Sequence, residues 1–225
     1  MKHGPTNTRR LKELKSSLKL SEVQRKVVIG TTLGDGCLIN SWSGRAARLQ
    51  IRHQVKHAEY VNWKYQFFNG WVLTPPRIDI YNNSVVFRTV SHPDLMEIKK
   101  IFYKDGKRFI PETINKLLAD PLSLAIWFMD DGSCYLDRLA FKLCSYGFRE
   151  KGNLLLSDCL KNNFNLQSVI YHDSKGFYLY FSKDSALRFY QLVKPYIIEC
   201  MKYKLRTVNP VETTRWLPRH VGMKI

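Results

Sequence analysis

The sequence has few cysteines, few acidic residues and no long apolar run. The cysteines form an odd set without a C-x-x-C pair, which argues against a disulfide framework or a zinc knuckle. They are Cys37, Cys134, Cys144, Cys159 and Cys200. The longest apolar run, 122–129, is far shorter than the roughly 18 residues of a membrane span. The start of the chain also lacks the apolar segment of a secretory signal, so we expect an intracellular protein with no membrane partner.

The scarcity of acids leaves a large positive charge. The 225 residues include 36 Lys+Arg and 19 Asp+Glu, for a net charge of +17, and 44% of residues are hydrophobic. This composition excludes wholesale disorder. The basic residues recur along the whole chain, whereas a membrane anchor usually concentrates them in one cluster. The distribution therefore favours a long polyanion, and nucleic acid is the expected partner.

Two apolar segments of the same kind stand about a hundred residues apart. Ser21 and Gln24 have capping-box spacing ahead of the run 27–36, and Asp120 followed by Pro121 suits the start of a second helix over 122–132. A helix that is apolar all round belongs in a core. Each run ends in an aspartate and a glycine, which predicts two buried helices with acids held at the edge of the core.

The two runs mark an internal duplication. VIGTTLGDG at 28–36 aligns with LAIWFMDDG at 124–132, and their final aspartates, Asp35 and Asp131, are 96 residues apart. Predicted strand pairs and hairpins follow each run at matching places. We therefore expect a mixed α/β fold of two pseudo-symmetric αββαββα halves. The expected divisions are a basic lead-in (1–20), a first half (21–115), a second half (116–205) and a C-terminal tail (206–225).

The duplicated runs resemble the signature motifs of the LAGLIDADG homing endonucleases. The similarity is to the single-chain, two-motif type encoded in group I introns, and it extends to 71–76, 109–114 and 195–205. It implies saddle-shaped antiparallel sheets and two packed motif helices at the interface. It also implies a site-specific nuclease that makes metal-dependent double-strand breaks in a long asymmetric DNA target and so promotes intron mobility.

The motif chemistry can be argued from the residues themselves. Gly30 and Gly34 share one helical face, so two helix backbones could approach closely and bring Asp35 and Asp131 together at one end. Neighbouring carboxylates repel unless a cation lies between them, and oxygen ligands suit Mg²⁺. The resemblance implies that both aspartates are catalytic metal ligands, helped by the backbone carbonyls of Gly34 and Asp130. We expect Mn²⁺ to substitute and Ca²⁺ to occupy the site without supporting cleavage; the number of ions and the role of the Asp130 side chain stay open.

A basic residue follows each acid at the same distance. Arg108 and Lys204 each lie 73 residues after Asp35 and Asp131, respectively, and resemble the cations beside the family's active sites. Such a cation would stabilise the charge developing on the phosphate. Because arginine cannot readily lose its proton, Lys107 remains the alternative for a proton-transfer role in the first half.

The strands supply candidate DNA contacts. Arg48, Gln50 and Arg52 alternate with apolar residues, and Arg and Gln pair with guanine and adenine in the major groove. Further candidates are Arg77, Tyr81 and Arg88 in the first half and Arg138, Lys142, Tyr178 and Tyr180 in the second. The less polar second set predicts that the halves recognise different half-sites.

Other interpretations carry less support. His53 and His57 have the spacing of a zinc pair on a helix, but no third ligand is evident and ordinary histidines are the simpler explanation. An RNA-binding intron maturase on the same fold is the alternative function, with intron RNA as its partner, although both acids are present. We expect a monomer in an organelle (mitochondrion or chloroplast) or a microbial cytoplasm.

Overall fold

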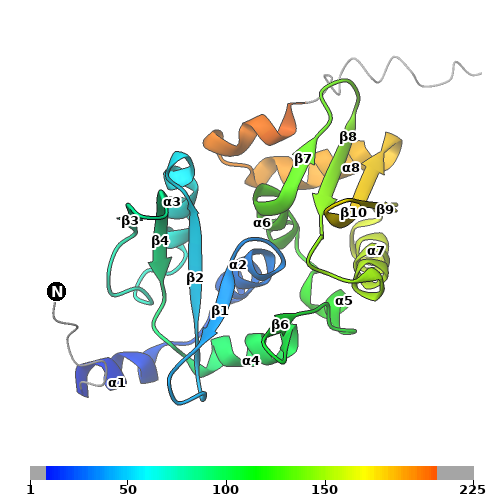
Figure 1. The fold of residues 1–225 in the computed structure, drawn as a ribbon. Coiled ribbons are helices and arrows are strands. Elements are labelled where there is room, and N and C mark those ends of the chain that lie inside the picture. The colour runs from blue at the N-terminus through cyan, green and yellow to red at the C-terminus, as the bar shows by residue number, and fades with distance from the viewer. Residues whose placement is uncertain (1–8, 207–225) are drawn as a thin grey trace, which may run out of the picture.

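A computed structural model describes residues 9–206, and its two halves repeat the same order of elements (Figure 1). The first half comprises α2 (Glu22–Leu33), β1 (Cys37–Asn40), β2 (Ala47–Gln54), α3 (Ala58–Gln66), β3 (Arg77–Asp79), β4 (Ser84–Arg88) and α4 (Pro93–Phe102). The second half comprises α6 (Pro121–Asp131), β7 (Gly132–Cys134), β8 (Ala140–Cys144), α7 (Glu150–Phe164), β9 (Val169–Asp173), β10 (Gly176–Ser182) and α8 (Lys183–Val193). The predicted αββαββα repeat is confirmed.

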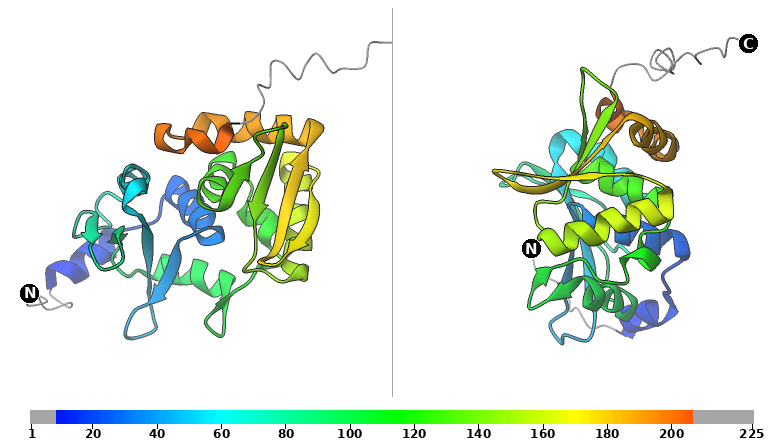
Figure 2. Two further views of the ribbon diagram at one scale, coloured as in Figure 1. Left: turned by 45° about the horizontal axis from the view of Figure 1, so that its top comes forward. Right: turned by 90° about the vertical axis from the view of Figure 1, so that its right-hand side faces the viewer.

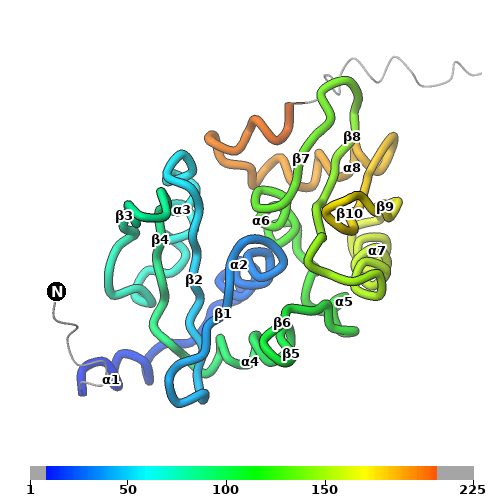
Figure 3. The backbone as a smooth tube through the Cα atoms, viewed as in Figure 1, coloured from blue at the N-terminus to red at the C-terminus, as the bar shows by residue number. Residues whose placement is uncertain are grey.

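Each half builds one antiparallel sheet of the same topology. The strand orders are β1-β2-β4-β3 and β7-β8-β10-β9. Figure 1 and the backbone tube of Figure 3 show α2 and α6 side by side between the sheets, which flank them on opposite sides. Figure 2 shows the same arrangement from two further directions, with α8 beside the second sheet. The two motif helices therefore form the centre of the molecule.

Shorter elements connect and extend the halves. They are α1 (Arg9–Ser17), η1 (Val55–His57), the hairpin of β5 (Tyr103–Lys104) and β6 (Lys107–Arg108), α5 (Ile114–Leu117), η2 (Lys194–Tyr196) and η3 (Glu199–Leu205). The predicted boundary at 115/116 falls inside α5 and remains a prediction. Of the expected lead-in and tail, residues 1–8 and 207–225 lie outside the described residues.

The starts of both motif helices form as local sequence predicts. Ser21 accepts a hydrogen bond from the Gln24 backbone N–H, and the Gln24 side chain accepts one from the Ser21 N–H, which completes the capping box. Asp120 accepts from the Leu122 N–H, with Pro121 in the first turn. These caps satisfy backbone donors that a helix start leaves without a partner.

Two elements end earlier than the sequence indicates. Helix α2 stops at Leu33, so Asp35 lies in the turn beyond it. Strand β3 stops at Asp79, because a turn closed by a hydrogen bond from Asn83 N–H to the Ile80 carbonyl takes the next residues. Asn83 adopts a positive φ of 43°, which asparagine tolerates better than most residues.

One continuous apolar core crosses both halves. It includes Val28 and Leu33 of α2, Trp127 and Phe128 of α6, and the inward residues of both sheets. Burial of this surface is the main force that holds the halves together. Within residues 9–206, no helix is both long and apolar enough to cross a bilayer.

Candidate active site

Helices α2 and α6 approach closely because α2 has glycine at the contact. A Cβ atom on Gly30 would lie 2.5 Å from the Ser123 carbonyl oxygen and 2.9 Å from Ile126 Cβ. A Cβ atom on Gly34 would lie 2.4 Å from Asp130 Cβ. These distances are too short for any side chain, so the close packing depends on the glycines of α2 fitting against larger residues of α6.

This packing brings the two motif acids to one end of the helix pair. Burial, and then the charge of Asp130, raises the pKa of Asp35. Burial, followed by the charges of Asp35 and Asp130, raises the pKa of Asp131 to about 7. Among the described residues no side chain hydrogen-bonds or ion-pairs with Asp131, and the charges of Arg108 and Lys204 offset only part of the effect of burial and of the neighbouring acids.

Asp130 differs from both motif acids because its side chain is fully buried. Its carboxylate accepts hydrogen bonds from Lys64 Nζ at 2.7 and 3.0 Å and from the Tyr60 hydroxyl at 2.9 Å. It also accepts one from the Asp35 backbone N–H at 3.2 Å. The Lys64 side chain is itself 0% exposed. The Asp130 side chain is thus part of a buried ion pair beneath the site.

Arg108 and Lys204 occupy equivalent positions. Arg108 Nη1 donates to the carbonyls of Thr32 (2.7 Å) and Gly34 (2.5 Å). Lys204 Nζ donates to the carbonyls of Phe128 (3.4 Å) and Asp130 (3.0 Å), which are the matching positions of the other helix. Burial lowers the pKa of Lys204.

The contacts of Arg108 and Lys204 also show which basic residue reaches the first site and whether the carbonyls of Gly34 and Asp130 can still bind a metal. Lys107 is exposed whereas Arg108 is partly buried, so Arg108 is the basic residue that reaches the first site. The carbonyls of Gly34 and Asp130 already accept one hydrogen bond each. A carbonyl oxygen has a second lone pair, so this bonding leaves each able to meet an ion.

In the first sheet, five of the six candidate DNA contacts share one face. Leu49 and Ile51 are fully buried, while Arg48, Gln50 and Arg52, which alternate with them, are partly exposed on the opposite face. The register places Gln50 opposite Arg88, whose Nε donates to Gln50 Oε1 at 2.5 Å. The residues on this face are Arg48, Gln50, Arg52, Arg77 and Arg88. Tyr81 is fully exposed but lies in the turn after β3, so the expectation that it extends the strand face is corrected.

In the second sheet the corresponding face is aromatic. Lys142 and Tyr180 are paired across β8 and β10, and Lys142 Nζ lies 3.6 Å from the centre of the Tyr178 ring. Tyr171 packs against both tyrosines. Arg138 lies in the loop between β7 and β8, over the Tyr135 ring, because β8 begins only at Ala140. The two faces therefore differ in chemistry, as the sequence predicts.

Sequence reasoning missed three residues of the first site. His53 lies beside Asp35, with Nδ1 3.5 Å from Asp35 Oδ2, and not in a zinc pair; His57 stacks on Tyr203 instead. Tyr60 and Lys64 approach Asp130 from α3. One available signal was the spacing of Tyr60, Val61 and Lys64, which places a lysine on the apolar face of a helix.

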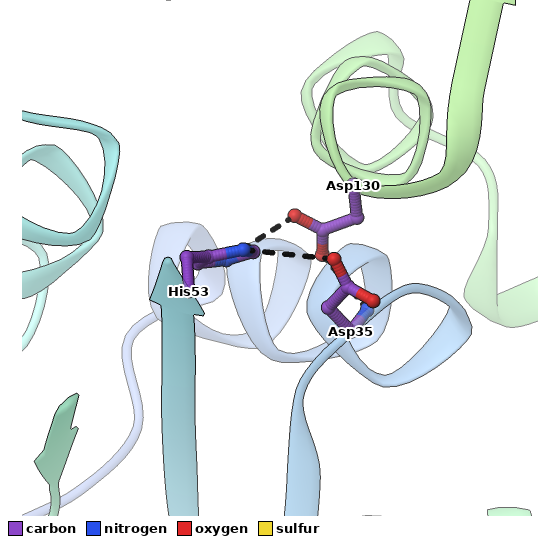
Figure 4. Close-up of side chains that lie close together, drawn as sticks. All are labelled: Asp35, His53 and Asp130. Carbon is purple, nitrogen blue, oxygen red and sulfur yellow. Dashed lines mark hydrogen bonds and ion pairs between the residues drawn. The ribbon is translucent and has the colours of Figure 1, made fainter. Parts of the chain in front are cut away.

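Figure 4 shows that His53 points from the end of β2 into the gap between Asp35 and Asp130. One ligand atom from each of the three residues lies within 4.8 Å of the others, although the Asp130 carboxylate is already paired with Lys64. The carboxylates of Asp35 and Asp131 and the two carbonyls offer oxygen donors, which suit a hard divalent ion such as Mg²⁺.

Comparisons with known proteins agree with this geometry. The sequence profile described as "LAGLIDADG DNA endonuclease family" matches residues 25–189. A probable intron-encoded endonuclease 1 of Wickerhamomyces canadensis is 30% identical over 217 residues, which cover 90% of this chain and 92% of the relative. The RecA protein of Mycolicibacterium flavescens is 32% identical over 223 residues, covering 88% of this chain and 52% of the relative. The chain thus spans about half the length of the RecA relatives it matches.

A solved structure extends the similarity to three dimensions. The homing endonuclease I-WcaI, bound to its DNA recognition sequence, superposes with a TM-score of 0.81 at 28% identity, covering 90% of this chain and 94% of that one. The paired halves and the central helices are therefore a shared architecture.

Proposed function

The chain belongs to the LAGLIDADG DNA endonuclease family, and we propose from this that it is a site-specific homing endonuclease. It would make metal-dependent double-strand breaks in a long asymmetric DNA target by phosphodiester hydrolysis and so promote the mobility of an intron. The observation that carries the proposal is the pair of motif acids, Asp35 and Asp131, at one end of two packed helices.

The donor set fits a divalent cation. Burial and the neighbouring carboxylates raise the pKa values of Asp35 and Asp131 more than the nearby cations lower them, and a bound divalent cation would offset the remainder. Asp35 and Asp131 would hold the metal, and the bound ion would polarise the scissile phosphate and activate water. Mg²⁺ is the proposed ion, with Mn²⁺ as a substitute and Ca²⁺ as a non-catalytic occupant.

The protein's own cations complete the proposed mechanism. Arg108 and Lys204 are held at the helix ends by two carbonyls each, so their charges are fixed before DNA binds. Fixed cations stabilise negative charge as it develops on the phosphate without reorganising at that moment. Arg108 stays protonated, so its role is electrostatic.

Cleavage is tested with a plasmid that carries the intron-lacking allele of the host gene. We expect linear product with Mg²⁺, no double-strand breaks with Asp35→Asn or Asp131→Asn, and DNA binding retained by both. Asp158→Asn, an exposed acid on α7, is the matched control and should cut normally. Breaks made by both active-site variants would refute the site, and intron splicing without DNA cleavage would support the maturase alternative.

Recognition is tested on the first sheet. Arg88 is exposed beside Gln50 on the outward face, where a base contact is possible. We expect Arg88→Ala to weaken binding of the target by about 1–3 kcal/mol and to relax specificity in one half-site. Lys161→Ala, an exposed cation on α7, should leave the specificity unchanged. Equal loss for target and random DNA would show that Arg88 contacts only the phosphate backbone.

A further inference from the structure

The two proposed active sites are not built alike. Gly34 is the position in the first half that corresponds to Asp130, so a third acid is present on one side only. Asp130 lies under Asp35 and accepts a hydrogen bond from the Asp35 backbone N–H at 3.2 Å. The helix contact explains this difference, because a Cβ atom on Gly34 would collide with Asp130.

The strand positions beside the acids also differ. Gln50 and Lys142 are equivalent, because each is paired with the second residue after the acid of its half. Counted three residues on from Gln50 and from Lys142, His53 therefore corresponds to Ser145, which directly follows β8. Ser145 is buried and bonds to Asn153, whereas His53 faces Asp35. The imidazole thus belongs to the first site alone.

His53 lies between a buried cation and a motif acid. Its Nε2 is 3.5 Å from Lys64 Nζ, and its Nδ1 is 3.5 Å from Asp35 Oδ2. The His53 side chain is only 8% exposed. Nε2 also lies 3.6 Å from Asp130 Oδ1, but that oxygen already accepts hydrogen bonds from Lys64 and Tyr60. The hydrogen bond left for Nε2 is therefore the one with Lys64.

The lysine decides which ring nitrogen carries the proton. An ammonium group has donors and no acceptor, so the nitrogen that faces it must offer a lone pair. Both oxygens of Asp130 accept from Lys64 Nζ, at 2.7 and 3.0 Å, which is the geometry of an ammonium paired with a carboxylate. Nε2 of His53 is then the acceptor, and the hydrogen of the neutral ring lies on Nδ1, where it faces the Asp35 carboxylate.

We propose that His53 is a positioning residue of the first active site: the buried ammonium of Lys64 fixes its Nδ1–H tautomer, and that N–H orients the carboxylate of Asp35. Because the second site has Ser145 and Gly34 at the equivalent positions, the device serves one DNA strand only. This inference rests on the proposed nuclease function for its effect on cleavage, but not for the tautomer itself.

The same geometry argues against His53 as a direct metal ligand. Ligation through Nδ1 would move the hydrogen to Nε2, where it would point at the Lys64 ammonium 3.5 Å away and at Asp130 Oδ1 3.6 Å away, which already accepts two hydrogen bonds. Two donors facing each other in a buried place are unfavourable. The cation paired with Asp130 is therefore Lys64 of the protein itself, and His53 acts on the site through Asp35.

The tautomer is tested first, in the full-length protein without DNA. Long-range proton–nitrogen NMR spectra of histidine-labelled protein, assigned with His53→Asn, should show a protonated Nδ1, and added Mg²⁺ should leave it protonated. A protonated Nε2, or loss of the Nδ1 proton when Mg²⁺ is added, would overturn the proposal. This measurement stands even if no DNA substrate is cut.

The effect on chemistry is tested by the nicking rate of each strand of a doubly labelled duplex. We expect His53→Leu to slow one strand by about 10–100-fold and the other by less than about threefold, with DNA affinity unchanged. His53→Asn keeps an N–H close to the Nδ1 position and should restore most of the lost rate. His57→Leu is the matched control. Equal slowing of both strands, or no rescue by asparagine, would show a merely structural role; absence of cleavage by the unaltered protein would instead refute the proposed function.

Discussion

The buried ion pair between Lys64 and Asp130 makes a sharp prediction about stability. Both side chains are 0% exposed, and Lys64 is the one cation of the described residues within ion-pair distance of Asp130. The His53 imidazole, 3.6 Å from Asp130, is neutral at pH 7.5 because burial lowers its pKa to about 4. Burial lowers the pKa of Lys64, and the Asp130 carboxylate opposes that change. Lys64→Met keeps most of the side-chain volume and removes the charge. The Asp130 carboxylate would then be left buried with only neutral hydrogen-bond donors.

The expected loss follows from this unpaired charge. Removing one partner of a buried ion pair costs about 3–5 kcal/mol. A typical domain has a free energy of unfolding of about 5–15 kcal/mol, so the variant should fold but melt on the order of 10 °C lower. Lys64→Met combined with Asp130→Asn removes both charges and keeps the hydrogen bond from Tyr60. We expect the double variant to recover at least half of the loss.

Denaturant unfolding of the unaltered protein, Lys64→Met, Asp130→Asn and the double variant, at pH 7.5 in EDTA, forms a double-mutant cycle. Circular dichroism and tryptophan fluorescence should give coincident transitions. A single-variant loss below about 1 kcal/mol would mean that the carboxylate takes up a proton or becomes hydrated at little cost. Strictly additive losses would show that the two charges do not interact, and either result would refute the reasoning from the buried pair.

Two further predictions concern the motif helices. The folded protein holds the proton of Asp131 more tightly than the unfolded chain does, because its pKa is raised to about 7 by burial and by the charges of Asp35 and Asp130. The contribution of Asp131 to the stability of the metal-free protein should therefore fall as the pH rises from about 4 to 7, and comparison with Asp131→Asn isolates it from the opposite contribution of His53. Asp131→Asn should remove that loss and gain about 1–2 kcal/mol at pH 8 after allowance for solvent screening, and a gain of the same size at pH 4 would contradict this. Gly34→Ala should cost about 1–3 kcal/mol or more by thermal unfolding, because its Cβ would lie 2.4 Å from Asp130 Cβ. Gly147→Ala, where no atom lies within 4 Å of the new Cβ, should be neutral, and equal losses for the two would refute the packing argument.

The parts of the fold that local sequence determines were predictable. The caps at Ser21 and Asp120 act within a few residues of the chain, and both form as expected. The duplicated order of helices and strands follows from apolar spacing that repeats in each half. The end of β3 was not predictable to the residue, because a turn closed at Asn83 competes with the strand for Ile80.

The candidate site was predictable only in its symmetric part. Arg108 and Lys204 were found by counting from the acids, since the duplication places them alike. Lys64 and Asp130 are 66 residues apart and come from different halves, so no periodic pattern links them. The lysine on the apolar face of α3 signals a buried cation, but its partner is defined only by tertiary structure.

The asymmetry of the site can be traced to the packing of the central helices. Close approach requires one helix to have no side chain at the contact, and Gly34 meets that requirement. The facing position on α6 can then carry a side chain, and here it is Asp130. A buried carboxylate needs a cation, which Lys64 supplies, and the ammonium in turn fixes how His53 meets Asp35. A duplicated fold thus acquires a buried third acid at one of its two sites from a single glycine, without any change in the acids that would hold the metal.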